Sequence, residues 1–136
     1  MKKLVLPALI ALVVVAGAAA LFYGSTVGAA PAGDRRSEPA PIDGLEIAVL
    51  ESSPVQYAAR IRAGLPSGCA QAAGHQMRRD GDIVTITVAN SMPRGNVACT
   101  MIYGTYDLSV TLGSEFRAGT AYSVRVNDKS TAFTAR

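Results

Sequence analysis

Two cysteines, one histidine and a few arginines are the side chains that could carry chemistry in this 136-residue chain. Cys69 and Cys99 are the only cysteines, and their wide spacing differs from the C-x-x-C pattern of redox and zinc sites. His75 is the only histidine, and a histidine base needs a nucleophile that no motif such as G-x-S-x-G supplies here. We therefore expect no catalytic residues, no metal site and no cofactor.

Four arginines are candidate binding residues. Arg60 and Arg62 share the outward face of a predicted strand, and Arg125 joins them if its strand belongs to the same sheet. Such a face would suit an anionic polymer or headgroup surface, but exposed arginines also occur on solvated strands and guard sheet edges. Arg94 lies in Ser91–Asn96, which has the composition of an exposed loop. A rigid loop that presents arginine is what inhibitors of trypsin-like proteases offer, although Pro-Arg-Gly is also ordinary loop composition.

The N-terminal residues predict export through an apolar helix. Lys2 and Lys3 precede the uncharged, mostly apolar run 4–23, a pattern that sends the rest of the chain across a membrane. At about 1.5 Å per residue this run matches the thickness of a hydrocarbon core, which favours a retained membrane tether. Residues 27–29 (VGA) instead offer a signal-peptidase site. Residues 1–29 are therefore a signal peptide or a signal anchor, and we expect an extracytoplasmic protein, secreted or anchored.

Export changes how the charges and cysteines are interpreted. The chain has 13 basic and 10 acidic residues, and subtracting Lys2 and Lys3 leaves 11 basic residues against the same 10 acidic ones. This near-neutral remainder gives no support for nucleic-acid binding, which requires clustered basic residues. In an oxidising compartment a lone cysteine pair ordinarily forms a bridge, so we predict a Cys69–Cys99 disulfide.

Residues 30–43 (APAGDRRSEPAPID) are rich in proline and alanine and show no periodicity, which predicts a solvated spacer. From residue 44 to residue 136, apolar and polar residues alternate with a period of two, which is typical of strands with one buried face. About seven strands are expected there, in one β-sandwich domain. The predicted strands are 45–51, 55–62, the two arms of a hairpin around Asp80-Gly81, 106–112, 122–126 and 132–134.

The hairpin around Asp80-Gly81 has the clearest local signal, because Asp-Gly supplies the positive φ angles of a two-residue turn. A turn centred on these two residues sets Met77 opposite Val84 and His75 opposite Ile86. Gly74 is a candidate bulge that would shift this register by one residue. The Cys69–Cys99 bridge should then close the open end of the hairpin.

Five segments of the exported part together carry a resemblance to known domains: 50–56 (LESSPVQ), 64–69 (GLPSGC), 79–81 (RDG), 98–100 (ACT) and 118–127 (AGTAYSVRVN). With these segments, the exported part resembles a group of small exported bacterial domains with an immunoglobulin-like fold. The resemblance implies an antiparallel immunoglobulin-like sandwich with both half-cystines in their usual places, and it brings no catalytic or binding role.

These observations favour a non-enzymatic binding or structural module at the cell envelope. Its partner would be an envelope protein or a polysaccharide, and nucleic acid is not expected. The alternative is an inhibitor of an extracellular trypsin-like protease that acts through Ser91–Asn96. A sandwich hosts both classes of function, so the fold alone does not distinguish them.

Overall fold

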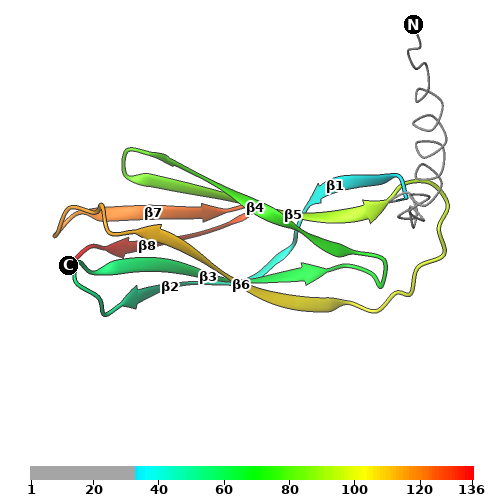
Figure 1. Cartoon of the computed structure of the whole chain (residues 1–136), viewed down its shortest axis with the longest axis horizontal. Helices are drawn as coiled ribbons and strands as arrows, with labels where there is room; N and C mark the ends of the chain where they lie inside the picture. Colours follow the sequence, from blue (N-terminus) through cyan, green and yellow to red (C-terminus); the bar gives the residue numbers. More distant parts are fainter. Residues whose placement is uncertain (1–32) are drawn as a thin grey trace, which may run out of the picture. The chain divides into compact units, whose positions relative to one another are not determined.

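The computed structural model describes residues 33–136, which form eight β-strands and no helix (Figure 1). The predicted export segment lies outside the described residues. Within them, no helix is long and apolar enough to span a membrane. The strands are β1 (Arg35–Pro39), β2 (Ile42–Leu50), β3 (Gln56–Leu65), β4 (Gln71–Asp80), β5 (Ile83–Pro93), β6 (Gly104–Gly113), β7 (Ala121–Val126) and β8 (Lys129–Thr134).

Two sheets form the predicted β-sandwich. The smaller sheet has the order β2-β3-β6 and is antiparallel throughout. In the larger sheet β5 is central: β4 pairs along one side, while β7 and β1 pair with successive halves of the other side, and β8 extends the sheet beyond β7. The β5–β7 pair is parallel. The predicted domain region contains seven strands, β2–β8, as expected, and β1 adds an eighth before it. The expectation of a purely antiparallel sandwich was wrong for the β5–β7 pair.

The predicted spacer is the main correction to the fold. Arg35–Pro39 is not solvated chain but strand β1, which pairs with the C-terminal half of β5. Ala40 and Ile42 are buried in the core. Strand β1 shows no apolar alternation, and it is held in place by backbone pairing with β5 and by the side chain of Arg35. The guanidinium of Arg35 donates to the side chain and carbonyl of Ser91, at 2.6 and 2.7 Å.

The core lies between the two sheets and follows the predicted alternation. On β3, Tyr57, Ala59 and Ile61 are buried while Arg60 and Arg62 are exposed. The same alternation places one side of each neighbouring strand inward, because successive side chains of a strand point to opposite faces. The buried hydrophobic residues of β5, β6 and β7 are Val84, Ile86, Val88, Val110, Leu112, Tyr122, Val124 and Val126.

A buried polar side chain links the two sheets. Asn90 on β5 is 1% exposed, and its amide donates to the carbonyl of Gly64 on β3 at 2.7 Å. The hydroxyl of Tyr106 on β6 donates to the Asn90 carbonyl oxygen at 3.0 Å. Burying an amide is costly unless its donor and acceptor are satisfied, so these bonds make a polar residue compatible with the core.

The β4–β5 hairpin differs from its predicted register. The pairs are Asp80–Ile83 and Met77–Ile86, so the turn is centred on Gly81 and Asp82 instead of Asp80 and Gly81. Only Gly81 takes a positive φ, of 60°. This is the geometry of a type II′ turn, which needs glycine only at its first central position. Asp80 can therefore stay in the strand. The predicted irregularity at Gly74 is confirmed, since the register shifts there.

Strand β4 forms an edge that the three-stranded sheet does not cover. All ten of its residues are exposed, Met77 among them. Its aliphatic content is low, and the Gly74 irregularity and the charged residues 78–80 are features that protect edges against pairing with other chains. Near its end, the Arg79 guanidinium lies 4.4 Å from the ring centre of Phe116 and anchors the hairpin to an aromatic cluster.

Candidate functional site on the outer face of the three-stranded sheet

The structure separates the four candidate arginines. Arg60 and Arg62 lie on the outer face of β3, as predicted. Arg125 lies on β7 in the other sheet, so it does not join them. The condition for a three-arginine face is therefore not met. Sheet membership depends on which distant strands pair, and the local alternation carries no information about this.

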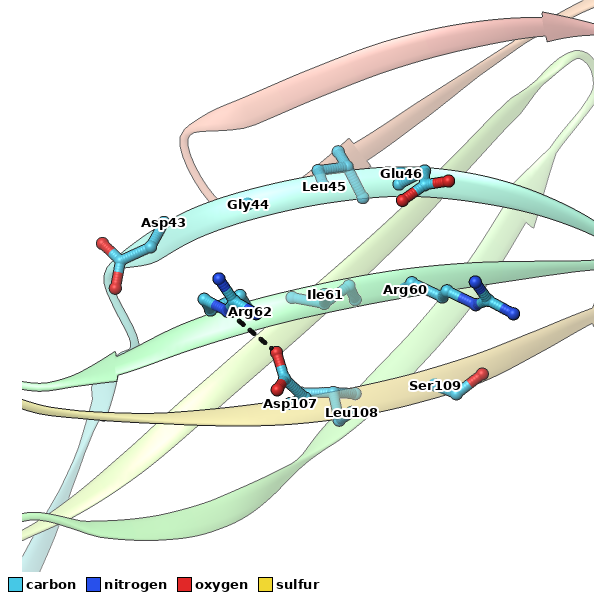
Figure 2. A pocket seen from close by; sticks show the side chains of 10 residues that line it. All are labelled: Asp43, Gly44, Leu45, Glu46, Arg60, Ile61, Arg62, Asp107, Leu108 and Ser109. Atoms are coloured by element: carbon cyan, nitrogen blue, oxygen red, sulfur yellow. Dashed lines mark hydrogen bonds and ion pairs between the residues drawn. The ribbon is translucent and has the colours of Figure 1, made fainter.

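A shallow groove of about 660 Å³ runs over the outer face of β2, β3 and β6 (Figure 2). Its outward-facing rows follow the strand register: Gly44, Arg62 and Asp107 lie side by side, and so do Glu46, Arg60 and Ser109. Small side chains at two of these six positions leave space between the longer ones. The groove is therefore a direct product of β-pairing across three strands.

The two arginines of the groove differ in their contacts. The Arg62 Nε atom donates to Asp107 Oδ1 at 3.0 Å, and both side chains remain more than half exposed. A solvent-exposed pair of this kind contributes at most about 1 kcal/mol to stability. Arg60 forms no hydrogen bond or ion pair with any described residue, although Glu46 is its neighbour in register. Its guanidinium therefore has free donors beside the groove.

Asp43 borders the groove and is held by a tyrosine from the β5–β6 connection. The Tyr103 hydroxyl contacts both carboxylate oxygens of Asp43, at 3.0 and 2.9 Å. The hydrogen bond to this carboxylate is the main cause that raises the pKa of Tyr103 above its ordinary value, with burial a smaller cause. Phenol and carboxylate thus form a fixed polar rim at one end of the groove.

The groove carries both signs of charge. Two guanidiniums, Arg60 and Arg62, lie among three carboxylates, Asp43, Glu46 and Asp107. A polyanion would meet these carboxylates at close range, so the face suits a partner that offers both charges or uncharged hydrogen-bonding groups. Sequence reasoning missed the carboxylates. Asp43 lay in the predicted spacer. Glu46 and Asp107 lie beside the arginines only because β3 pairs with β2 and β6.

The segment Ser91–Asn96 is only in part the exposed loop that was expected. Its first three residues end strand β5 and pair with β1. The Arg94 backbone N–H donates to the Asp34 carbonyl at 2.9 Å, and its guanidinium lies 3.4 Å from the Asp34 carboxylate. The Arg94 side chain is 59% exposed, and its Nε atom donates to the Arg35 carbonyl at the start of β1 at 3.4 Å.

The cysteine prediction is confirmed. Cys69 and Cys99 form a disulfide with their Cα atoms 5.5 Å apart. Cys69 precedes β4 and Cys99 follows β5, so the bridge closes the open end of the hairpin. His75 is exposed on β4 opposite Val88. Among residues 33–136 no three His, Cys, Asp or Glu side chains are grouped as a metal site would require.

Fold and site together define a small, disulfide-bonded β-sandwich domain. The family model described as ORF11 beta-sandwich domain matches residues 59–135, which run from within β3 to the end of β8. The chain belongs to this family. Comparisons with curated proteins and with solved structures gave no significant match.

Proposed function

We propose that the protein is a non-enzymatic, extracytoplasmic module of the cell envelope that binds a protein or polysaccharide partner in the groove on β2, β3 and β6. The observation that carries the proposal is Arg60, a guanidinium with unused donors beside an open groove. A free arginine among fixed carboxylates can orient a partner by paired charge and hydrogen bonds. Export is supported by the Cys69–Cys99 bridge, because disulfides persist in oxidising compartments.

An immunoglobulin-like relationship is part of this proposal. Its support is the second residue of β7, Tyr122, whose hydroxyl accepts a hydrogen bond from the Arg117 backbone N–H five residues upstream at 2.9 Å. The tyrosine corner of immunoglobulin-like sandwiches has this arrangement. Domains of that class commonly act by presenting surfaces to partners, which agrees with a binding role.

Cross-linking in living cells tests the binding role directly. A photoreactive amino acid replaces Ser109 in the groove of the full chain, and adducts are isolated after irradiation and identified. We expect one dominant adduct that Arg60→Ala weakens by about tenfold, the effect of losing one or two charge-assisted hydrogen bonds. Arg125→Ala is the matched control, because Arg125 is also an exposed strand arginine but lies in the other sheet.

A polysaccharide partner requires a second assay, because it can escape protein identification. The purified chain is sedimented with cell-wall material at low and high salt. Retention that falls in Arg60→Ala and weakens as salt is raised fits a partner held by this guanidinium, because salt screens exposed charge pairs. Equal adducts and equal retention for wild type and Arg60→Ala would refute the groove as the site. A hydrolytic activity that survives purification and disappears in His75→Ala would refute the non-enzymatic role.

A further inference from the structure

The connection between β5 and β6 exposes the most accessible large apolar side chains of the described residues. Met101 is 89% exposed and Ile102 is 71% exposed, and Val97 and Tyr103 follow at 52% and 50%. The other large apolar residues at the surface of the described part are no more than 45% exposed. Adjacent apolar residues with this accessibility form a contiguous patch, and such patches on soluble domains commonly mark interaction sites.

This connection is held in place on both sides of the apolar pair. Cys99 is bonded to Cys69, and the carbonyl of Thr100 accepts a hydrogen bond from the Gly68 backbone N–H at 3.0 Å. On the other side, the Tyr103 hydroxyl is hydrogen-bonded to the Asp43 carboxylate. The backbone around Met101 and Ile102 is thus anchored to the domain, while the two side chains project away from it.

Two glycines make this close packing possible. A Cβ atom at Gly64 would lie 1.8 Å from the Tyr103 hydroxyl oxygen, and one at Gly68 would lie 2.0 Å from Thr100 Oγ1. Neither distance is compatible with a side chain at the present position of its neighbour. The absence of side chains at Gly64 and Gly68 therefore leaves the space that Tyr103 and Thr100, the residues that flank Met101 and Ile102, occupy.

The chain enters the described domain beside this patch. The Arg35 guanidinium donates to the Cys69 carbonyl at 2.9 Å, and Cys69 is bonded to Cys99. Asp34 in turn contacts Arg94, at the start of the same connection. The beginning of β1 and the β5–β6 connection accordingly lie at one end of the sandwich, opposite the C-terminus (Figure 1).

The linker to the N-terminal apolar run is short. Residues 24–33 separate the run 4–23 from Asp34, so β1 begins much closer to the run than the predicted spacer implied. Ten residues reach at most about 35 Å when fully extended. A retained anchor would therefore hold the start of β1, and with it the patch, within about 35 Å of the bilayer surface, which is close enough for the patch to reach the membrane.

With residues 4–23 retained as an anchor, we propose that Met101 and Ile102 insert into the surface of the same membrane. Tyr103 then lies at headgroup level, where tyrosine is enriched because its ring is apolar and its hydroxyl is polar. The hydroxyl is already bonded to Asp43, so only the ring needs apolar contact. Insertion of the patch would fix the orientation of the domain and hold the groove of β2, β3 and β6 at a defined angle to the membrane.

Tryptophan fluorescence tests this proposal cleanly, because the chain contains no tryptophan. Mass spectrometry first establishes that native membrane-bound protein retains Lys2 and Lys3. The full chain carrying Ile102→Trp is then reconstituted into phosphatidylcholine vesicles with brominated acyl chains, which quench fluorescence only at close range. Ile83→Trp is the control, since Ile83 is 37% exposed and lies at the other end of β5.

We expect brominated lipid to quench Ile102→Trp several-fold and to leave Ile83→Trp unchanged. Adding Met101→Asp to the Ile102→Trp chain should lower the inserted fraction by about tenfold, the effect of replacing one inserted apolar side chain. All variants alter exposed positions, and equal melting temperatures and the absence of free thiols verify that they fold as the wild type does.

Four results would overturn the proposal. The first is equal emission from the two tryptophan variants in brominated vesicles. The second is quenching that needs anionic lipid and disappears at high salt, which would indicate attraction of charged residues and not insertion. The third is a native chain that begins near Ala30 and so lacks the anchor. The fourth is a protein adduct at position 102 in cells without quenching in vesicles, which would assign the patch to a protein partner.

Discussion

The side chain of Asn127 binds both main-chain groups of Val88. The Val88 N–H donates to Asn127 Oδ1 at 3.0 Å, and Asn127 Nδ2 donates to the Val88 carbonyl at 2.8 Å. At this point β5 has left β7, whose pairing ends at Ile86, and has not yet met β1, whose pairing begins at Ala89. The side-chain amide of Asn127 thus satisfies the backbone of β5 at the position between its pairing with β7 and its pairing with β1.

Asn127→Ala should destabilise the domain by about 2–3 kcal/mol, because it removes these bonds and leaves the Val88 N–H without its acceptor. Position 127 also has a φ of 49°, which asparagine tolerates better than alanine. Thermal unfolding checks the prediction, with an expected fall in melting temperature of roughly 10 °C or more. Asp128→Ala, at the next turn position, is the control and should change stability by less than about 0.5 kcal/mol. A wild-type melting temperature for Asn127→Ala would contradict this role.

Replacing both cysteines by serine should cost about 3–4 kcal/mol, because the bridge closes a loop with a sequence separation of 30 and restricts the unfolded chain. Denaturant unfolding of wild type, reduced wild type and the double variant measures the loss. The reduced protein and the variant should agree. If the variant kept wild-type stability, the bridge would contribute little, and the patch around Met101 would need another restraint.

Tyr106→Phe should lower stability by about 1 kcal/mol, because Asn90 loses a hydrogen-bond donor inside the sandwich. Burial raises the pKa of Tyr106 above 10.0, which means that folding favours the neutral phenol. The resulting stabilisation is complete below pH 10 and is lost as the pH rises through the raised, folded-state pKa. Unfolding free energies measured from pH 8 to pH 12 should therefore fall less steeply for Tyr106→Phe than for wild type. Parallel curves would show that Tyr106 does not contribute to the alkaline loss.

Gly64→Ala should displace Tyr103, since the added Cβ would occupy the position of the tyrosine hydroxyl. Without its bond to Asp43, the pKa of Tyr103 should move down toward its ordinary value. Spectrophotometric titration of wild type, Gly64→Ala and Tyr103→Phe detects the change and assigns it. Gly44→Ala is the control, because its Cβ would meet only Arg62 Cβ, at an ordinary 3.5 Å. An unchanged titration in Gly64→Ala would mean that the domain adjusts by moving β3 instead of the tyrosine.

Much of this structure could be predicted from the alternation of apolar residues alone. Val84, Ile86 and Val88 could be assigned to the core, and Arg60 and Arg62 to the surface, because the two faces of a strand follow from local backbone geometry. The Cys69–Cys99 bridge was likewise predictable, since the chain has no other cysteine.

The pairing of distant strands decided which strands are neighbours, and local sequence patterns do not encode this. Strand β1 has no apolar alternation, and it forms because β5 offers an unpaired edge beyond the end of β7. Arg125 belongs to the larger sheet because β7 pairs with β5, and the groove mixes arginines with carboxylates because β2 and β6 flank β3. Each of these results depends on contacts between residues far apart in the chain. Local periodicity specifies which side of a strand is buried, but only long-range pairing specifies which strands become neighbours.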